Sequence, residues 1–176
     1  MNKILIALGA NLPGAKGGPE TTLRSAIEAM PSFGIRVVRV APFYRTPALA
    51  GYIQPDYVNS AAEIEAAEPP EVLLGTLHRI EALFGRFRRD RWAPRVIDID
   101  LLDYRGVVIP GGSGRSGVAG MPIALPHPGI GSRGFVLVPL RDVAPDWRHP
   151  VTGRSVGDLI AALPDGEVLA VRRAES

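Results

Sequence analysis

The first hundred residues contain four short apolar runs, each bounded by glycine, proline or polar residues. Runs of this length in this setting are typical of strands with at least one buried face. The predicted strands cover residues 3–9, 35–44, 57–66 and 96–104.

Two helical patterns separate these strands. Apolar residues recur at helical spacing from Glu20 to about Pro31, and a second apolar stripe runs from Pro69 to about Gly85. The resulting order, β-α-β-β-α-β, is that of a split βαβ arrangement. We therefore expect an α+β fold, a ferredoxin-like βαββαβ core with helices packed on the sheet and long loops.

Three weaker patterns follow in the last third of the chain. Residues 135–145 form an apolar segment that indicates a short helix, and residues 155–163 indicate a C-terminal helix. Residues 167–172 are consistent with a last strand.

Composition narrows the class of protein. The chain has 176 residues, of which 46% are hydrophobic and 22% charged, as expected for one globular domain spanning residues 1–176. It has no cysteine, which excludes disulfides and thiolate metal sites. No apolar stretch reaches the length of a membrane span, and the N-terminus lacks a signal-peptide pattern. We expect a cytoplasmic protein with no membrane partner.

The net charge is only +2, but the basic residues are unevenly distributed. Five arginines fall within ten residues, opposed there only by Asp90, and this local excess indicates an anionic partner. Each guanidinium group can donate two parallel hydrogen bonds to phosphate oxygens, which favours a polyphosphate as the partner. The alternative interpretation of this segment is a solvated basic loop or a nucleic-acid patch. The five are Arg86, Arg88, Arg89, Arg91 and Arg95.

Directly after this basic segment come Asp98 and Asp100 in the fourth predicted strand. Residues two apart in a strand point to the same side, so the two carboxylates should share a face. Adjacent carboxylates resist joint ionisation unless a cation lies between them, and Mg²⁺ prefers oxygen ligands. Alone, the pair would read as the exposed edge of a half-buried strand. Beside the arginines, it indicates a site for Mg²⁺ and polyphosphate.

Other polar and aromatic residues give weaker signals. Asn59 could read the edge of a heteroaromatic ring, although an asparagine at the start of a strand is more often a turn residue. Trp92 could stack on a ligand or simply anchor the arginine-rich loop. His127 and Arg133 could donate to phosphate, or His127 could be structural. His78 shares a helix face with Glu81, three residues away.

Several segments in order resemble the 6-hydroxymethyl-7,8-dihydropterin pyrophosphokinase family. The stretch RWAPRVIDIDLL (91–102) is similar to the family signature. Agreement extends to ALGANL near the start, to FYRTPAL and QPDYVNSA, and to LPHPGIGSRGFVLVPLRDVAPDW (125–147). The resemblance covers roughly residues 3–150.

The resemblance implies transfer of a pyrophosphoryl group from ATP to the hydroxymethyl group of the pterin, with release of AMP, in folate biosynthesis. It implies two Mg²⁺ ions held by Asp98 and Asp100, a monomeric enzyme and no nucleic-acid partner. Arg86, Arg88 and Arg95 would be catalytic. The implied pterin-binding residues are Thr46, Leu49, Tyr57, Asn59, Trp92 and Phe135, and the implied ATP-binding residues are His78, Glu81, Arg91, His127 and Arg133.

Two rival functions follow from the same features. An RNA-binding module could combine a ferredoxin-like sheet with a basic loop, but it would display aromatic residues on its strand faces, and the predicted strands lack that pattern. A different Mg²⁺-dependent kinase could act on another heterocycle.

Overall fold

The computed structural model of the chain describes residues 3–48, 54–86, 95–112 and 122–174. Within these residues a sheet has the strand order β5-β1-β4-β3-β6, and β2 also pairs with β4. Every strand pairing in it is antiparallel. The strands are β1 (Ile4–Ala10), β2 (Arg36–Val40), β3 (Tyr44–Thr46), β4 (Tyr57–Glu65), β5 (Asp98–Tyr104) and β6 (Arg172–Arg173).

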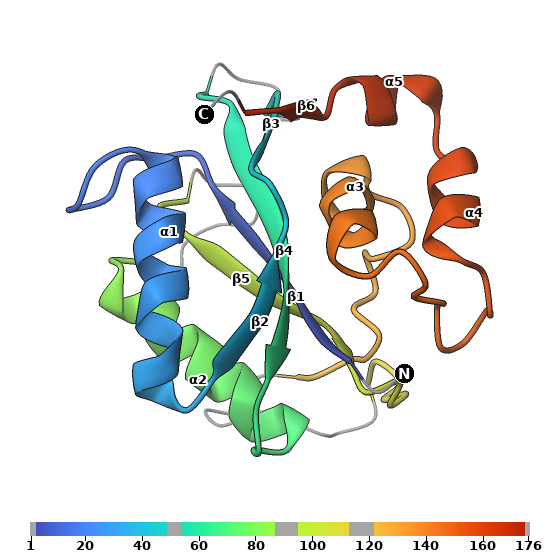
Figure 1. Cartoon of the computed structure of the whole chain (residues 1–176), viewed down its shortest axis with the longest axis horizontal. Helices are drawn as coiled ribbons and strands as arrows, with labels where there is room; N and C mark the ends of the chain where they lie inside the picture. The colour runs from blue at the N-terminus through green and yellow to red at the C-terminus, as the bar shows by residue number, and fades with distance from the viewer. Residues whose placement is uncertain (1–2, 49–53, 87–94, 113–121, 175–176) are drawn as a thin grey trace.

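Helices cover both faces of the sheet (Figure 1). On one face lie α1 (Pro19–Ala29), the short 3₁₀ helix η1 (Met30–Phe33) and α2 (Pro70–Leu83). On the other lie α3 (Gly134–Val143), α4 (Val156–Ala161) and α5 (Asp165–Leu169). The molecule is thus built in three layers, with the sheet in the middle.

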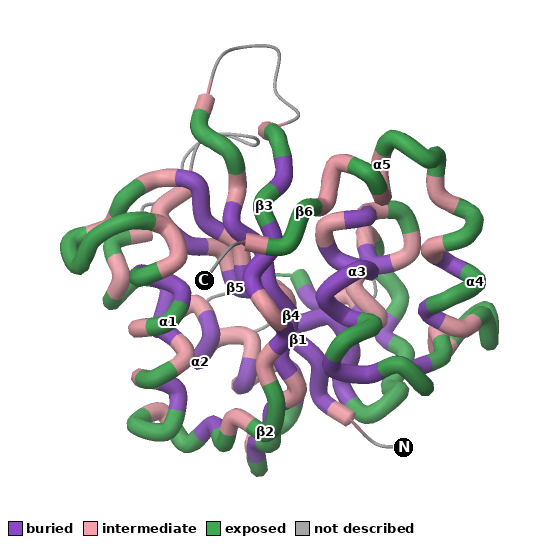
Figure 2. Tube along the Cα trace, turned by 45° about the horizontal axis from the view of Figure 1, so that its top comes forward, coloured by how far each residue is buried: buried purple, intermediate pink, exposed green. Residues whose placement is uncertain are grey.

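Alternation along the central strand β1 supplies both hydrophobic cores. Ile4, Ile6 and Leu8 pack with buried residues of α1 and α2, whereas Leu5 packs with residues of α3. Because both faces of β1 are covered, its sequence is a continuous apolar run. Figure 2 shows buried chain along β1, β4 and α3, while α4 has buried and exposed positions and α5 has no buried residue.

The expected α+β class is confirmed as an antiparallel sheet with packed helices. The strands predicted over 3–9, 57–66 and 96–104 and the helices predicted over 20–31, 69–85, 135–145 and 155–163 are present, with boundaries shifted by a few residues. Ser155 and Asp158 form a capping box at the start of α4, which fixes where this helix begins.

Two strand predictions are wrong. The single strand predicted over 35–44 is divided into β2 and β3, which pair with different parts of β4. Pro42 lies in the break, where its missing N–H cannot contribute to a strand ladder. Residues 167–172 were expected to form a strand, but the chain forms α5 there, and only Arg172–Arg173 pair with β3. Asp165 and Glu167 in the first turn of α5 favour the helix electrostatically.

In the part of the chain that the structure describes, no helix has the length and apolar character needed to cross a lipid bilayer.

Candidate functional site

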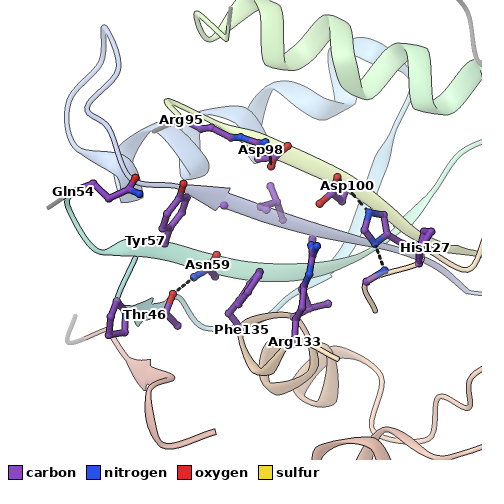
Figure 3. Close-up of a pocket in the computed structure, with 17 residues that line it drawn as sticks. Thr46, Gln54, Tyr57, Asn59, Arg95, Asp98, Asp100, His127, Arg133 and Phe135 are labelled. Carbon is purple, nitrogen blue, oxygen red and sulfur yellow. Dashed lines mark hydrogen bonds and ion pairs between the residues drawn. The ribbon is translucent and has the colours of Figure 1, made fainter. Parts of the chain in front are cut away.

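A cavity of about 400 Å³ opens beside β1, β4 and β5 and is bounded on one side by the start of α3 (Figure 3). It brings together residues that are far apart in the sequence. The predicted site residues that line it are Thr46, Tyr57, Asn59, Arg95, Asp98, Asp100, His127, Arg133 and Phe135.

One wall of the cavity combines aromatic and amide groups. Tyr57 projects from β4 and Phe135 from α3, and both side chains reach the cavity (Figure 3). Asn59 is buried two residues along β4 from Tyr57, and its Nδ2 donates a hydrogen bond of 2.8 Å to Thr46 Oγ1. Gly9 faces Asn59 across the β1–β4 pairing, where a Cβ atom would lie 3.1 Å from Asn59 Oδ1. The glycine therefore leaves room for this amide. The wall can hold a flat, hydrogen-bonding ring.

The opposite wall carries the two aspartates of β5. Asp98 and Asp100 both reach the cavity, whereas Ile97, Ile99 and Leu101 are buried in the core. The shared face predicted from strand alternation is therefore confirmed.

The two carboxylates have different surroundings. Asp98 Oδ1 accepts a hydrogen bond from Arg86, and Asp98 Oδ2 accepts one from Arg95. The side chain of Asp100 is 41% exposed toward the cavity, and its Oδ1 lies 4.0 Å from His127 Nε2. Partial burial and the neighbouring Asp98 charge raise the pKa of Asp100, and nearby His127, Arg86 and Arg133 oppose that shift.

Glu81 supports this wall from behind. Its side chain is buried, and Oε1 accepts a hydrogen bond of 2.6 Å from the Ile99 N–H and another from Arg86. Burial raises the pKa of Glu81 to about 7; Arg86 and the Ile99 N–H oppose the rise, and Asp98 and Asp100 add to it. Arg86 thus bridges Glu81 to Asp98. Glu81 and Arg86 do not line the cavity.

The third wall follows the segment between β5 and α3. The His127 N–H donates to the carbonyl oxygen of Leu102, and His127 Nδ1 accepts from the Gly129 N–H at 3.0 Å. A neutral imidazole with Nδ1 as acceptor carries its proton on Nε2, which faces Asp100. The Arg133 guanidinium lies over the Phe135 ring at 5.9 Å and packs against Gly129. Both side chains present N–H donors near the aspartates.

The remaining predicted residues lie elsewhere. His78 is half-buried on α2 and does not line the cavity. Leu49, Arg88, Arg91 and Trp92 lie outside the described residues, so their predicted roles stay predictions.

A metal at this site would depend on the aspartate pair. Among the described residues, no group of three or more His, Cys, Asp or Glu side chains converges well enough to hold an ion. Asp98 and Asp100 offer oxygen ligands only. This donor set fits Mg²⁺, which commonly binds proteins through one or two carboxylates and completes its shell with water and phosphate oxygens.

Sequence reasoning assigned no role to Gln54 or Asn11. Gln54 lines the cavity, and the buried Asn11 contacts Gln54 and the backbone of Arg95. Asn11 belongs to the segment ALGANL and Gln54 to QPDYVNSA. The similarity of these segments to the family was a signal that they contribute to the site, but neither residue type alone indicates such contacts.

The chain is similar in sequence to known proteins. A family model described as 7,8-dihydro-6-hydroxymethylpterin-pyrophosphokinase (HPPK) matches residues 5–145. A Methylorubrum extorquens 2-amino-4-hydroxy-6-hydroxymethyldihydropteridine pyrophosphokinase is 37% identical over 94% of this chain and 97% of the relative. The Synechocystis protein of the same name is 36% identical over 89% of this chain and 73% of its own length.

Solved structures show the same fold. A Plasmodium falciparum HPPK-DHPS structure superposes with a TM-score of 0.71 at 13% identity, covering 91% of this chain and 44% of the other. Our chain therefore spans less than half of that protein, and the likeness concerns the fold alone. The match to the family model over most of the chain, together with relatives above 30% identity over nearly their whole length, shows that this chain belongs to the HPPK family.

Proposed function

We infer that this protein transfers the pyrophosphoryl group of ATP to the hydroxymethyl group of 6-hydroxymethyl-7,8-dihydropterin, giving the pterin diphosphate and AMP, in folate biosynthesis. Family membership supports the reaction. The observation that carries it to this chain is a single cavity with an aromatic and amide wall facing two aspartates beside arginines.

The aromatic and amide wall is the proposed pterin site. Tyr57 and Phe135 are suited to contact the faces of a pterin ring, because offset stacking suits two aromatic surfaces. Asn59 and the backbone of Thr46 can pair with the donors and acceptors along its edge. In the same proposal, Leu49 and Trp92 border the pterin.

The aspartate wall is the proposed site of two Mg²⁺ ions, held by Asp98 and Asp100. When bound, Mg²⁺ would neutralise charge on the ATP phosphates as a Lewis acid. Because Arg86 and Arg95 already contact Asp98, an incoming polyphosphate can draw these guanidinium groups onto its own oxygens and free the carboxylate.

The donors of the third wall are proposed to bind ATP phosphates. His127 offers Nε2–H and Arg133 offers its guanidinium toward the aspartates. Arg91 and His78 are proposed to contact ATP, and Arg88 to act in catalysis. Glu81, which we also place on the nucleotide side, would act through Arg86.

Positioning and charge stabilisation account for catalysis in this proposal. Phosphoryl transfer passes through a loose transition state with charge spread over the phosphate oxygens, so cations placed around it can lower the barrier without a strong base. Arg86 and Arg95 are held at the site by Asp98 and Glu81 before substrate binds. Little reorganisation is then needed during the reaction.

The ferredoxin-like topology, the oligomeric state, the domain structure and the cellular location of the enzyme are also proposals. The split βαβ reading is supported by the place of β4, which lies between β1 and the pair β2 and β3. It is further supported by β1, which lies between β4 and β5. We propose a monomeric, cytoplasmic, single-domain enzyme over residues 1–176, and light scattering coupled to gel filtration would test the monomer.

The decisive experiment measures AMP release from ATP with the pterin present and absent, with Mg²⁺ or with excess EDTA. We expect AMP only when both pterin and Mg²⁺ are present. AMP without pterin, or with a different heterocycle only, would contradict the proposed substrate. A thermal shift with a short RNA but none with an ATP analogue and pterin would favour the RNA-binding rival.

A further inference from the structure

Asn11 directly follows β1, and it is 1% exposed. Its Oδ1 accepts a hydrogen bond of 2.7 Å from the Arg95 N–H. Its Nδ2 donates to Gln54 Oε1 at 3.0 Å and to the Pro55 carbonyl oxygen at 3.2 Å. The backbone N–H groups of Asn11 and Leu12 donate to the Arg95 carbonyl oxygen at 2.9 and 3.1 Å. Both polar groups of the Arg95 backbone are therefore bound at this point.

These contacts join three segments that are distant in sequence. Asn11 lies 43 and 44 residues from its partners Gln54 and Pro55, and 84 residues from Arg95. An asparagine that only shapes a turn bonds its own backbone about two residues away. The side chain of Asn11 instead satisfies its donors and its acceptor across the fold.

The joined segments lead into the two walls of the cavity. Pro55 comes two residues before Tyr57, and Arg95 comes three residues before Asp98. Gln54 and Arg95 themselves line the cavity. Figure 3 shows Gln54 with Tyr57 on one side and Arg95 with Asp98 on another. A single buried amide thus ties the entry to β4 to the entry to β5.

We propose that Asn11 is a positioning residue that sets the spacing between the pterin wall and the phosphate end of the site. The proposal rests on the proposed function. Asn11 contacts the segments that precede both walls. Its loss should therefore misalign the pterin and ATP relative to each other, while each still binds to its own wall. A misplacement near 1 Å between reacting groups lowers rate by up to about 100-fold.

The test compares Asn11→Ala with the wild type. We expect kcat for AMP release to fall about 10- to 100-fold. The Kd of 6-hydroxymethyl-7,8-dihydropterin alone and the Kd of Mg²⁺–α,β-methylene-ATP alone should each change less than about threefold, because each ligand uses one wall. A pterin Kd that weakens as much as kcat falls would place Asn11 in the pterin site and overturn the proposal.

A matched control separates positioning from loss of stability. Tyr104, at the far end of β5 from Asp98, donates a half-buried hydrogen bond of 2.7 Å to the Glu68 carbonyl oxygen. Tyr104→Phe should lower Tm and keep kcat within about twofold of wild type, since a lost hydrogen bond alone acts on stability. If this control loses as much kcat as Asn11→Ala at equal folded fraction, the role of Asn11 is only structural.

Asn11→Ser keeps the test decisive if the alanine variant does not fold. It buries no charge and keeps one hydroxyl, but its side chain is too short to bond the Arg95 N–H and the Gln54 and Pro55 oxygens together. We expect an intermediate loss of kcat, larger than threefold. A wild-type kcat in this variant would overturn the proposal, whereas failure of the wild type to release AMP would overturn the proposed function instead.

Discussion

Asp98 and Asp100 share a strand face but differ in what holds them. Asp98 is bound by two arginines, so its removal would leave Arg86 with Glu81 alone, would take the carboxylate partner from Arg95, and would disturb the wall itself. The nearest ion-pair partner of Asp100, in the described part of the chain, is His127 at 4.0 Å. Asp100 is therefore the cleaner residue for testing the metal.

We predict that Asp100→Asn lowers kcat for AMP release on the order of 10²- to 10³-fold, the loss expected when one preorganised charge contact is removed. Tm should not fall, because the substitution removes repulsion from Asp98. Asp146→Asn, the same chemical change at an exposed position, is the control. A kcat within tenfold of wild type at saturating Mg²⁺ would argue against a metal role for Asp100.

Glu81 gives a prediction on pH and stability. Its folded pKa of about 7 lies above its ordinary value of 4.5, so the folded state keeps a proton that the unfolded state has released between these values. The stabilising contribution is fully present below about pH 4.5 and is lost as pH rises through about 7. Stability from this residue therefore falls toward alkaline pH.

Glu81→Gln should remove this dependence while keeping an acceptor for the Ile99 N–H. Between pH 5 and 8, the free energy of unfolding should fall by about 2 kcal/mol less in the variant than in the wild type. Denaturant unfolding at both pH values measures the difference. Glu28→Gln, an exposed change on α1, should leave the pH dependence as in wild type. An unchanged pH slope in Glu81→Gln would contradict the assignment.

A residue's role could be predicted from the sequence only where it depends on residues nearby in the chain. The common face of Asp98 and Asp100 depends on strand alternation alone, so their spacing within a predicted strand was enough to predict it. The role of Asn11 depends on partners 43 to 84 residues away, which no local pattern encodes. The same holds for Gln54, whose place on the cavity is known only when β4 pairs with β1.

At the scale of elements, the start of α3 determines where two cavity residues lie. Gly134 stands between Arg133 and Phe135, and a Cβ atom on it would lie 2.4 Å from the backbone oxygen of Glu167 in α5. Backbone cannot move aside as a side-chain end can, so α3 and α5 would have to separate. The close approach of these helices thus requires glycine at position 134.

We predict that Gly134→Ala lowers the free energy of unfolding by about 1–3 kcal/mol, as overpacking of a close contact does. It should also weaken pterin binding, because Phe135 is its neighbour. The matched control is Gly166→Ala in α5, where a Cβ atom would meet nothing within 4 Å. There, alanine should be neutral or stabilising by up to about 1 kcal/mol. Equal Tm values for the two variants would contradict this account.

The division between β2 and β3 shows the limit of element prediction. The apolar run over 35–44 is real, but Pro42 interrupts its pairing, and β3 then pairs with β6 from the far end of the chain. The run predicted strand structure, and Pro42 was a sequence signal for the break, but the run alone could not show which strand each half would pair with. Residues 167–172 failed for a related reason, since the partner of the two-residue β6 is formed more than a hundred residues earlier.

At the scale of the whole molecule, the residues matched by the family model include one hydrophobic core almost entirely and the other only in part. Apart from Ile4, the buried residues of the core under α1 and α2 lie within residues 5–145, whereas α4, α5 and β6 follow that range. These last elements contact elements that carry the site. Val156 and Leu159 of α4 pack in the core beneath α3, and β6 extends the sheet beside β3, which carries Thr46.

Removal of residues 164–176 tests how far this last segment supports the pterin wall. The truncation deletes α5, which has no buried residue, and β6. β6 pairs with β3, and the Ala174 N–H donates to the Phe43 carbonyl oxygen, so both contacts hold β3 in place. We predict that the pterin Kd rises about fivefold, the equivalent of roughly one lost hydrogen bond near 1 kcal/mol. The Kd of Mg²⁺–α,β-methylene-ATP should stay within twofold, because Asp98, Asp100 and His127 lie on the other side of β1. Calorimetric titration of each ligand measures both. Equal weakening of the two ligands would mean that the segment stabilises the fold as a whole rather than this wall.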